Sequence, residues 1–150
     1  MYKIKWVSFY DLKAVAQVEC ESLPFEPRLE PWHPSLHEMY SLWLMRFIKK
    51  THKIIVAEDI KTRKIVGFLS IDNILKPYIQ TLYVKPRYFR QGVGHELLDF
   101  IETFTRNKGA TEIFLDVEAS NFGAISFYTK HKFVQFRDNN SHLIKMVKEL

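Results

Sequence analysis

Two glycines lie close together in the segment Phe89–Leu98, which reads F-R-Q-G-V-G-H-E-L-L. The apolar spacing from Val93 through Leu97 to Phe104 predicts an amphipathic helix that begins at these glycines. The first backbone N–H groups of a helix lack partners within it and carry partial positive charge, so this turn could bind an anion such as a pyrophosphate. A turn that uses glycine only for its conformational freedom explains the pattern equally well.

The segment matches neither of the two common nucleotide-binding loops. A G-x-G-x-x-G loop would need glycine at Leu97, and a Walker loop would need G-K-[ST]. It resembles instead the acetyl-CoA loop of the GNAT superfamily of N-acetyltransferases, usually written [Q/R]-x-x-G-x-[G/A] and preceded by a strand that ends in apolar-V-x-P. The run Leu82–Pro86, L-Y-V-K-P, provides that strand end.

This resemblance implies that the chain binds acetyl-CoA as its cosubstrate. The first Gln or Arg of the family pattern falls on Phe89, so one side-chain contact of the family is missing, although Arg90 and Gln91 follow at once. The backbone amides of the loop are not affected by this departure. The residues implied to bind the cofactor are Leu82, Tyr83, Val84, Phe89, Arg90, Gln91, Gly92, Val93, Gly94, His95, Asn121 and Tyr128.

A second stretch, Leu115–Phe133, resembles another element of the same superfamily, in which a strand is followed by N-x-x-A-x-x-[F/L]-Y and then by a G-F pair. The matching residues are Asn121, Ala124, Phe127, Tyr128 and Phe133, while Lys132 replaces the glycine. Both motifs stand at the separation typical of the family, and together with the order of elements they cover almost the whole chain.

Tyr128 is the residue to which the resemblance gives a chemical role. Taken alone, an aromatic residue at helical spacing from Ala124 and Ile125 is typical of a core. In enzymes of the superfamily a tyrosine here lies near the thioester sulfur and donates a proton as coenzyme A departs. A thiol of pKa about 8.5 leaves more readily protonated than as a desolvated thiolate. Asn121 is implied to hydrogen-bond the pantetheine arm.

The attacking amine also needs a base, because a primary amine of pKa about 10.4 must lose a proton before it attacks. Many relatives carry a glutamate on the strand before the loop, where this chain has Gln80, which cannot take up a proton. Asp116 and Glu118 are the other candidates. L-D-V-E-A-S-N resembles the L-E-V-x-x-S-N of bacterial ribosomal-protein N-terminal acetyltransferases, which implies that Asp116 is the base. A structural acid that bonds backbone amides is the alternative.

The acceptor side of the site is less well defined by sequence. Phe25, Trp32 and Tyr40 stand where the superfamily places its acceptor wall, and with Gln80 they are the candidate substrate-binding residues. Packing of the proline-rich loop onto the core would explain the three aromatics as well. His33 and His37 lack a nearby acid or cysteine cluster, so no metal site is expected.

Periodicity predicts the elements that must position these residues. Strands are expected at Tyr2–Val7, Lys53–Glu58, Lys64–Asp72, Tyr78–Val84, Glu112–Val117, Phe133–Phe136 and His142–Val147, the last two forming a hairpin around Asp138–Asn140. Helices are expected from Ser8 to about Leu23, from Ser35 to about Lys50, from the glycine loop to Gly109, and at Asn121–Lys130. The fold class is therefore α/β (α+β). We expect one GNAT-like domain over residues 1–150, with a mixed, mostly antiparallel sheet of about seven strands, about four helices and the order βααβββαβαββ.

Composition narrows the function. The net charge of +5 on 150 residues is spread along the chain with acids between the bases, which argues against a nucleic-acid-binding module. No apolar run approaches the roughly 20 residues of a membrane span, so we expect a cytoplasmic protein, monomeric or homodimeric. The leading hypothesis is an N-acetyltransferase that moves an acetyl group from acetyl-CoA to a primary amine by direct attack in a ternary complex. A non-catalytic acyl-CoA-binding domain of the same fold is the alternative.

Overall fold

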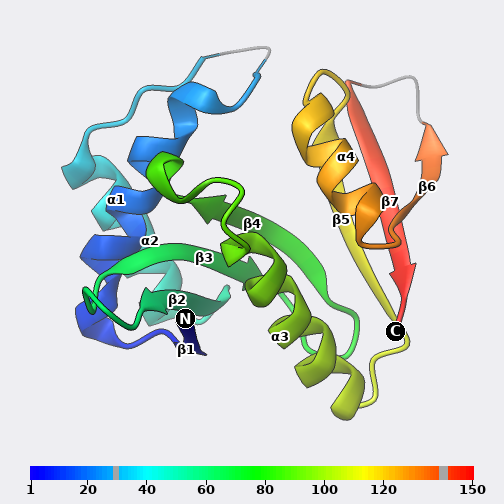
Figure 1. Ribbon diagram of the computed structural model, residues 1–150, viewed down its shortest axis with the longest axis horizontal. Helices are drawn as coiled ribbons and strands as arrows, with labels where there is room; N and C mark the ends of the chain where they lie inside the picture. Colours follow the sequence, from blue (N-terminus) through cyan, green and yellow to red (C-terminus); the bar gives the residue numbers. More distant parts are fainter. Residues whose placement is uncertain (29–30, 139–141) are drawn as a thin grey trace.

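The computed structural model describes residues 1–28, 31–138 and 142–150, and its elements confirm the order βααβββαβαββ (Figure 1). The strands are β1 (Tyr2–Trp6), β2 (Lys53–Asp59), β3 (Ile65–Ile71), β4 (Tyr78–Val84), β5 (Glu112–Glu118), β6 (Val134–Asp138) and β7 (Leu143–Glu149). The helices are α1 (Leu12–Ser22), α2 (Leu36–Lys49), α3 (Val93–Asn107) and α4 (Phe122–Lys130). The predicted turn of the last hairpin, at Asp138–Asn140, falls largely outside the described residues.

The strands form one mixed sheet in the order β1-β2-β3-β4-β5-β7-β6. All neighbouring pairs are antiparallel except β4 and β5, which run parallel. Their pairing is confined to Tyr78 with Phe114 and Ile79 with Leu115. Beyond these residues the two strands diverge, and Figure 1 shows the sheet opening between β4 and β5.

Alternation along the strands divides the core between the two faces of the sheet. On β2, Ile54 and Val56 are packed in a cluster with α1 and α2, whereas Ile55 and Ala57 belong to the cluster that contains α3. The second cluster continues across β5 to α4 through Ile113, Leu115 and Val117. The helices therefore cover both faces, with α3 and α4 on the same side of the opened sheet (Figure 1).

Local signals explain where the helices begin. The Ser35 hydroxyl accepts a hydrogen bond from the Glu38 amide at 3.1 Å, and the Glu38 carboxylate accepts one from the Ser35 amide at 3.1 Å, which is the expected capping box of α2. At the first helix, the Ser8 amide donates to the Asp11 carboxylate at 2.9 Å, and a 3-10 turn at Phe9–Asp11 leads into α1. Within the described ranges no helix is long and apolar enough to cross a membrane.

Candidate active site

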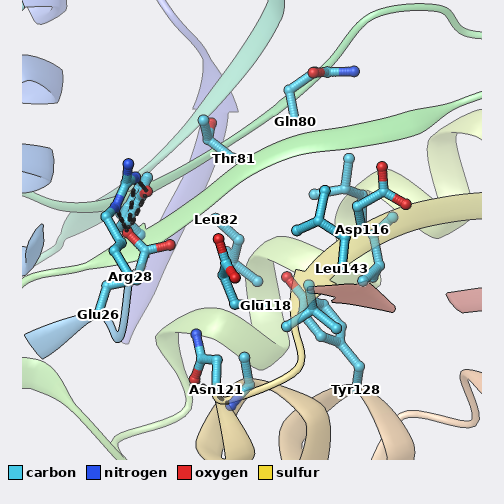
Figure 2. Close-up of a pocket in the computed structure, with 15 residues that line it drawn as sticks. Glu26, Arg28, Gln80, Thr81, Leu82, Asp116, Glu118, Asn121, Tyr128 and Leu143 are labelled. Atoms are coloured by element: carbon cyan, nitrogen blue, oxygen red, sulfur yellow. Dashed lines mark hydrogen bonds and ion pairs between the residues drawn. The ribbon is translucent and has the colours of Figure 1, made fainter. Parts of the chain in front are cut away.

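The divergence of β4 from β5 creates a cavity of about 240 Å³. Described residues of five segments surround it: β4, β5, β7, α4 with its preceding loop, and the segment that follows α1. Figure 2 shows the side chains that line this pocket. They are Glu26, Arg28, Ile79, Gln80, Thr81, Leu82, Tyr83, Leu115, Asp116, Val117, Glu118, Asn121, Ala124, Tyr128 and Leu143.

An irregularity in β4 lies at the pocket. Ser70 pairs with Thr81 and Ile71 pairs with Ile79, so Gln80 is an extra residue with no partner on β3. A bulge of this kind bends a strand and increases its local twist. The bend begins where the pairing between β4 and β5 stops, and it gives a physical reason for the opening of the sheet. Gln80 itself is exposed at the pocket edge.

Tyr128 reaches the pocket from α4. Its side chain is 8% exposed and packs edge-on against Phe133, with ring centroids 5.4 Å apart. Burial, with a smaller effect of the Glu26 charge, raises the pKa of the Tyr128 phenol above its usual value. The phenol therefore remains protonated at neutral pH. Figure 2 shows its hydroxyl directed into the pocket, where it can donate a hydrogen bond.

The acidic residues of β5 lie on the other face of that strand. Leu115 and Val117 are buried in the cluster under α4, so Asp116 and Glu118 face away from it. Asp116 is exposed, and in Figure 2 its carboxylate points away from Tyr128. Burial, and next the Asp116 carboxylate, raises the pKa of Tyr78. The Tyr78 hydroxyl is buried and has no hydrogen-bond partner among the described residues.

Glu26 enters the pocket from the segment after α1. Its Oε2 accepts hydrogen bonds from the Tyr83 hydroxyl at 2.9 Å and from Arg28 Nη2 at 3.1 Å and Nε at 3.2 Å. The Cζ atom of Arg28 also lies 5.7 Å from the ring centroid of Trp32. Burial, followed by the charges of Glu19 and Glu26, raises the pKa of Tyr83 and keeps its hydroxyl protonated as a donor.

The predicted anion-binding turn lies at the start of α3. Gly92 has a left-handed φ of 87° and immediately precedes the helix, and Arg90 also has a positive φ of 60°. The side-chain amide of Gln91 donates to the Arg87 carbonyl at 2.9 Å and holds the turn closed. The backbone amides of the first helical turn are left without partners inside the helix. Phe89 contacts Phe25, with ring centroids 5.8 Å apart.

Residues 12–133 match the Acetyltransferase (GNAT) family. The chain belongs to this family. No curated protein matches the chain. Among solved structures it is similar to the PaiA N-acetyltransferase from Thermoplasma acidophilum in complex with coenzyme A, with 26% identity, coverage of 100% and 99% of the two chains and a TM-score of 0.85. As a GNAT acetyltransferase, the chain is an acyltransferase whose cosubstrate is acetyl-CoA.

Two further structures show the same fold at lower identity. The ribosomal-protein-S18-alanine N-acetyltransferase from Escherichia coli is 20% identical, with coverage of 99% and 94% and a TM-score of 0.74. An acetyltransferase from Thermus thermophilus is 15% identical, with coverage of 100% and 97% and a TM-score of 0.82. These similarities confirm the mixed sheet and helix arrangement predicted from the sequence of this GNAT acetyltransferase.

The structure brings part of the predicted site of the GNAT acetyltransferase into the pocket. The predicted residues that line it are Gln80, Leu82, Tyr83, Asp116, Asn121 and Tyr128. Asn121 is the N-cap of α4, and its side-chain oxygen accepts from the Ala124 amide at 3.1 Å, so its NH₂ group is the part left for a ligand. Val84 ends β4 just beyond the pocket. The other predicted cofactor residues form the turn before α3 and its first residues: Phe89, Arg90, Gln91, Gly92, Val93, Gly94 and His95.

The aromatic residues predicted as an acceptor wall lie elsewhere. Phe25 is exposed and contacts Phe89, Trp32 is beside Arg28, and Tyr40 packs on the core of α1 and α2. None of the three lines the pocket that contains Tyr128. Sequence reasoning did not select Glu26 and Arg28, whose only signal is a pair of opposite charges two positions apart in a proline-rich stretch. The described residues contain no group of three or more His, Cys, Asp or Glu placed to hold a metal.

Proposed function

We propose that this GNAT acetyltransferase transfers the acetyl group of acetyl-CoA directly to a primary amine bound with it in a ternary complex. The observation that supports this most is the direction of the Tyr128 hydroxyl, which enters the pocket formed where β4 and β5 separate. Residues of β4 line one side of that pocket, and the same chain segment continues past Val84 into the turn before α3. One extended cofactor can therefore contact both.

The cofactor is proposed to bind with its pyrophosphate at the start of α3. The free amides from Gln91 to His95 and the positive end of the helix favour a polyanion there. The basic side chains of Arg87 and Arg90 lie in the same turn. The pantetheine arm is proposed to follow Leu82, Tyr83 and Val84 and to accept a hydrogen bond from the Asn121 amide group.

Tyr128 is proposed as the general acid. When the amine adds to the thioester carbon and the C–S bond breaks, negative charge develops on sulfur inside the pocket. The protonated phenol can donate a hydrogen bond to that charge and then its proton. The raised pKa of Tyr128 is consistent with this role, since the group must carry its proton when the sulfur departs.

Asp116 is proposed as the base that removes the proton of the acceptor. It lines the same pocket, but its carboxylate points away from the Tyr128 hydroxyl, so the proton would pass through water. Gln80 stands at the pocket edge as a polar acceptor contact. Phe25, Trp32 and Tyr40 are proposed to bind more distant parts of an acceptor rather than its reacting nitrogen.

The direct test is release of coenzyme A thiol from acetyl-CoA against a panel of primary amines, with mass spectrometry of the acylated product. The panel should hold alkylamines, diamines, amino sugars, lysine peptides and peptides with free N-termini. Thiol release that depends on an amine and yields an N-acetyl product is expected. Binding of acetyl-CoA without amine-dependent release for any member would support the non-catalytic alternative.

A further inference from the structure

Glu26 is held in the pocket more firmly than the other acids that line it. It stands between Pro24 and Pro27, and its backbone has φ −95° and ψ 120°, the extended conformation that a residue before proline favours. Its amide donates to the Leu23 carbonyl at 3.0 Å. The backbone and the Tyr83 hydroxyl thus fix this carboxylate independently of any ligand.

The two oxygens of the Glu26 carboxylate have different surroundings: Oε2 accepts hydrogen bonds, and the second oxygen points into the pocket. Every contact that the structure gives to the Glu26 side chain within the described ranges is made by Oε2, to Tyr83 and Arg28. Figure 2 shows the second oxygen pointing toward the middle of the pocket, toward Glu118 on the opposite side. Oε1 of Glu118 lies 3.8 Å from His142 Nε2.

The Tyr128 hydroxyl is directed into the pocket that these two acids also line, and it provides a separate indication of a ligand. Tyr128 is 8% exposed, and its hydroxyl, directed into the pocket, has no hydrogen bond within the described residues. A hydroxyl on so deeply buried a side chain is available to donate a hydrogen bond to a ligand in the pocket. A ligand that accepts a hydrogen bond from it occupies the same pocket as Glu26 and Glu118.

The pocket and the turn before α3 carry opposite charges. Among the described residues, the pocket is lined by the acids Glu26, Asp116 and Glu118 and by a single base, Arg28. The turn before α3 is basic instead, with Lys85, Arg87 and Arg90. The phosphates of the cofactor are favoured at the turn, and a cation is favoured between the acids. Arg28 already places a guanidinium on one oxygen of Glu26, which shows that this carboxylate accepts a cationic donor.

We infer that Glu26, with Glu118 opposite it, binds the ammonium group of the acceptor, so that the enzyme selects acceptors that are cations when they enter. This inference rests on the proposed function, because it assigns the acceptor of the same pocket. The ammonium nitrogen donates to the second oxygen of Glu26 while Arg28 keeps the first. Its proton then passes to the base, so Glu26 acts mainly on binding and less on the chemical step.

The test compares Glu26→Gln and Glu118→Gln with the wild type, using a primary alkylamine that the wild type acetylates. The alcohol in which hydroxyl replaces the amine serves as a competitive inhibitor. Glu21→Gln is the matched control, since Glu21 is exposed on α1 and does not line the pocket. Equal stabilisation of all variants by acetyl-CoA in a thermal scan establishes that the fold and the cofactor site are intact.

For Glu26→Gln we expect KM for the amine to rise roughly 10- to 100-fold, as for loss of a charge-assisted hydrogen bond, with kcat changed less than about threefold. Glu118→Gln should also raise KM for the amine. The inhibition constant of the alcohol should change less than about twofold in both variants. An unchanged KM for the amine, or an equal weakening of amine and alcohol, would overturn the inference while leaving the transferase activity established. A wild type that acetylates no amine would instead refute the proposed function and this inference with it.

Discussion

Nδ1 of His95 lies 2.9 Å from Nε2 of His131, and this contact joins the first turn of α3 to the end of α4. His131 Nδ1 lies 2.8 Å from the Phe127 carbonyl oxygen, which can only accept, so this nitrogen carries a hydrogen. In the neutral ring Nε2 of His131 is then an acceptor, and Nδ1 of His95 must be the donor. The helix that begins at the glycine turn and the helix that carries Tyr128 are thus connected by a hydrogen-bond chain of fixed direction.

Removal of the His95 donor should weaken this connection. We expect His95→Ala to lower the free energy of unfolding by about 0.5–1 kcal/mol, at the low end for a hydrogen bond because His95 is exposed. His95→Gln, whose amide can still donate, should retain most of the wild-type stability. Urea denaturation at pH 8 measures both, and equal stability of His95→Ala and the wild type would show that the contact does not hold the helices together.

Gly67 on β3 determines how closely α3 approaches the sheet. A Cβ atom at this position would lie 2.8 Å from Val93 Cγ1 and 3.1 Å from the Tyr83 carbonyl oxygen. The backbone oxygen cannot move aside cheaply, so Gly67→Ala should destabilise the fold by about 1–3 kcal/mol. Gly123→Ala is the control, because the nearest atom to its Cβ is 3.9 Å away and alanine favours the helix. Thermal unfolding should give a lower Tm only for Gly67→Ala.

Much of this fold was predictable because its signals are local. Strand alternation, capping residues and the glycine turn lie within short segments, and the predicted ends of the strands differ from the observed ones by at most two residues. The two motifs identified the family, which the match over residues 12–133 confirms. Tyr128 could be selected because it belongs to one of those motifs.

The acceptor side could not be predicted in the same way. The hydrogen bond between Tyr83 and Glu26 joins residues 57 positions apart, and no local pattern marks Glu26 as its partner. The opening of the sheet depends on where β4 and β5 stop pairing and on the bulge at Gln80. Strand composition does not encode either feature. The predicted role of Phe25, Trp32 and Tyr40 in binding an acceptor therefore stays a prediction, and these residues lie outside the lining of this pocket.

Gly92 offers a charge test of the proposed phosphate site. Its left-handed φ of 87° strains any side chain, by about 1–2 kcal/mol, and no atom lies within 4 Å of a Cβ built there. Gly92→Glu and Gly92→Lys therefore share the strain and the open space but differ in charge. We expect the glutamate variant to bind acetyl-CoA at least ~100-fold more weakly than the lysine variant, because a carboxylate repels the phosphates. Calorimetric titration with acetyl-CoA measures this, and equal affinities would remove the turn from the cofactor site.

Tyr128→Phe separates proton donation from packing, because phenylalanine keeps the ring that contacts Phe133 and removes only the hydroxyl. If the hydroxyl is the general acid, kcat should fall by ~10²-fold or somewhat more, since the donor acts as charge develops on sulfur. The affinity for acetyl-CoA should change little. Stopped-flow kinetics and calorimetric titration of the same variant provide the two measurements.

The size of the kcat effect has meaning only if the chemical step limits turnover. A burst of thiol in the wild type would show that product release is slower, and single-turnover rates should then be compared instead. The affinity for acetyl-CoA separates the two roles further: a packing residue that disturbs α4 would weaken binding, whereas a proton donor would not. If Tyr128→Phe turns over within about threefold of the wild type with chemistry limiting, water or another group must protonate the thiolate, and the buried hydroxyl serves only to bind ligands in the pocket.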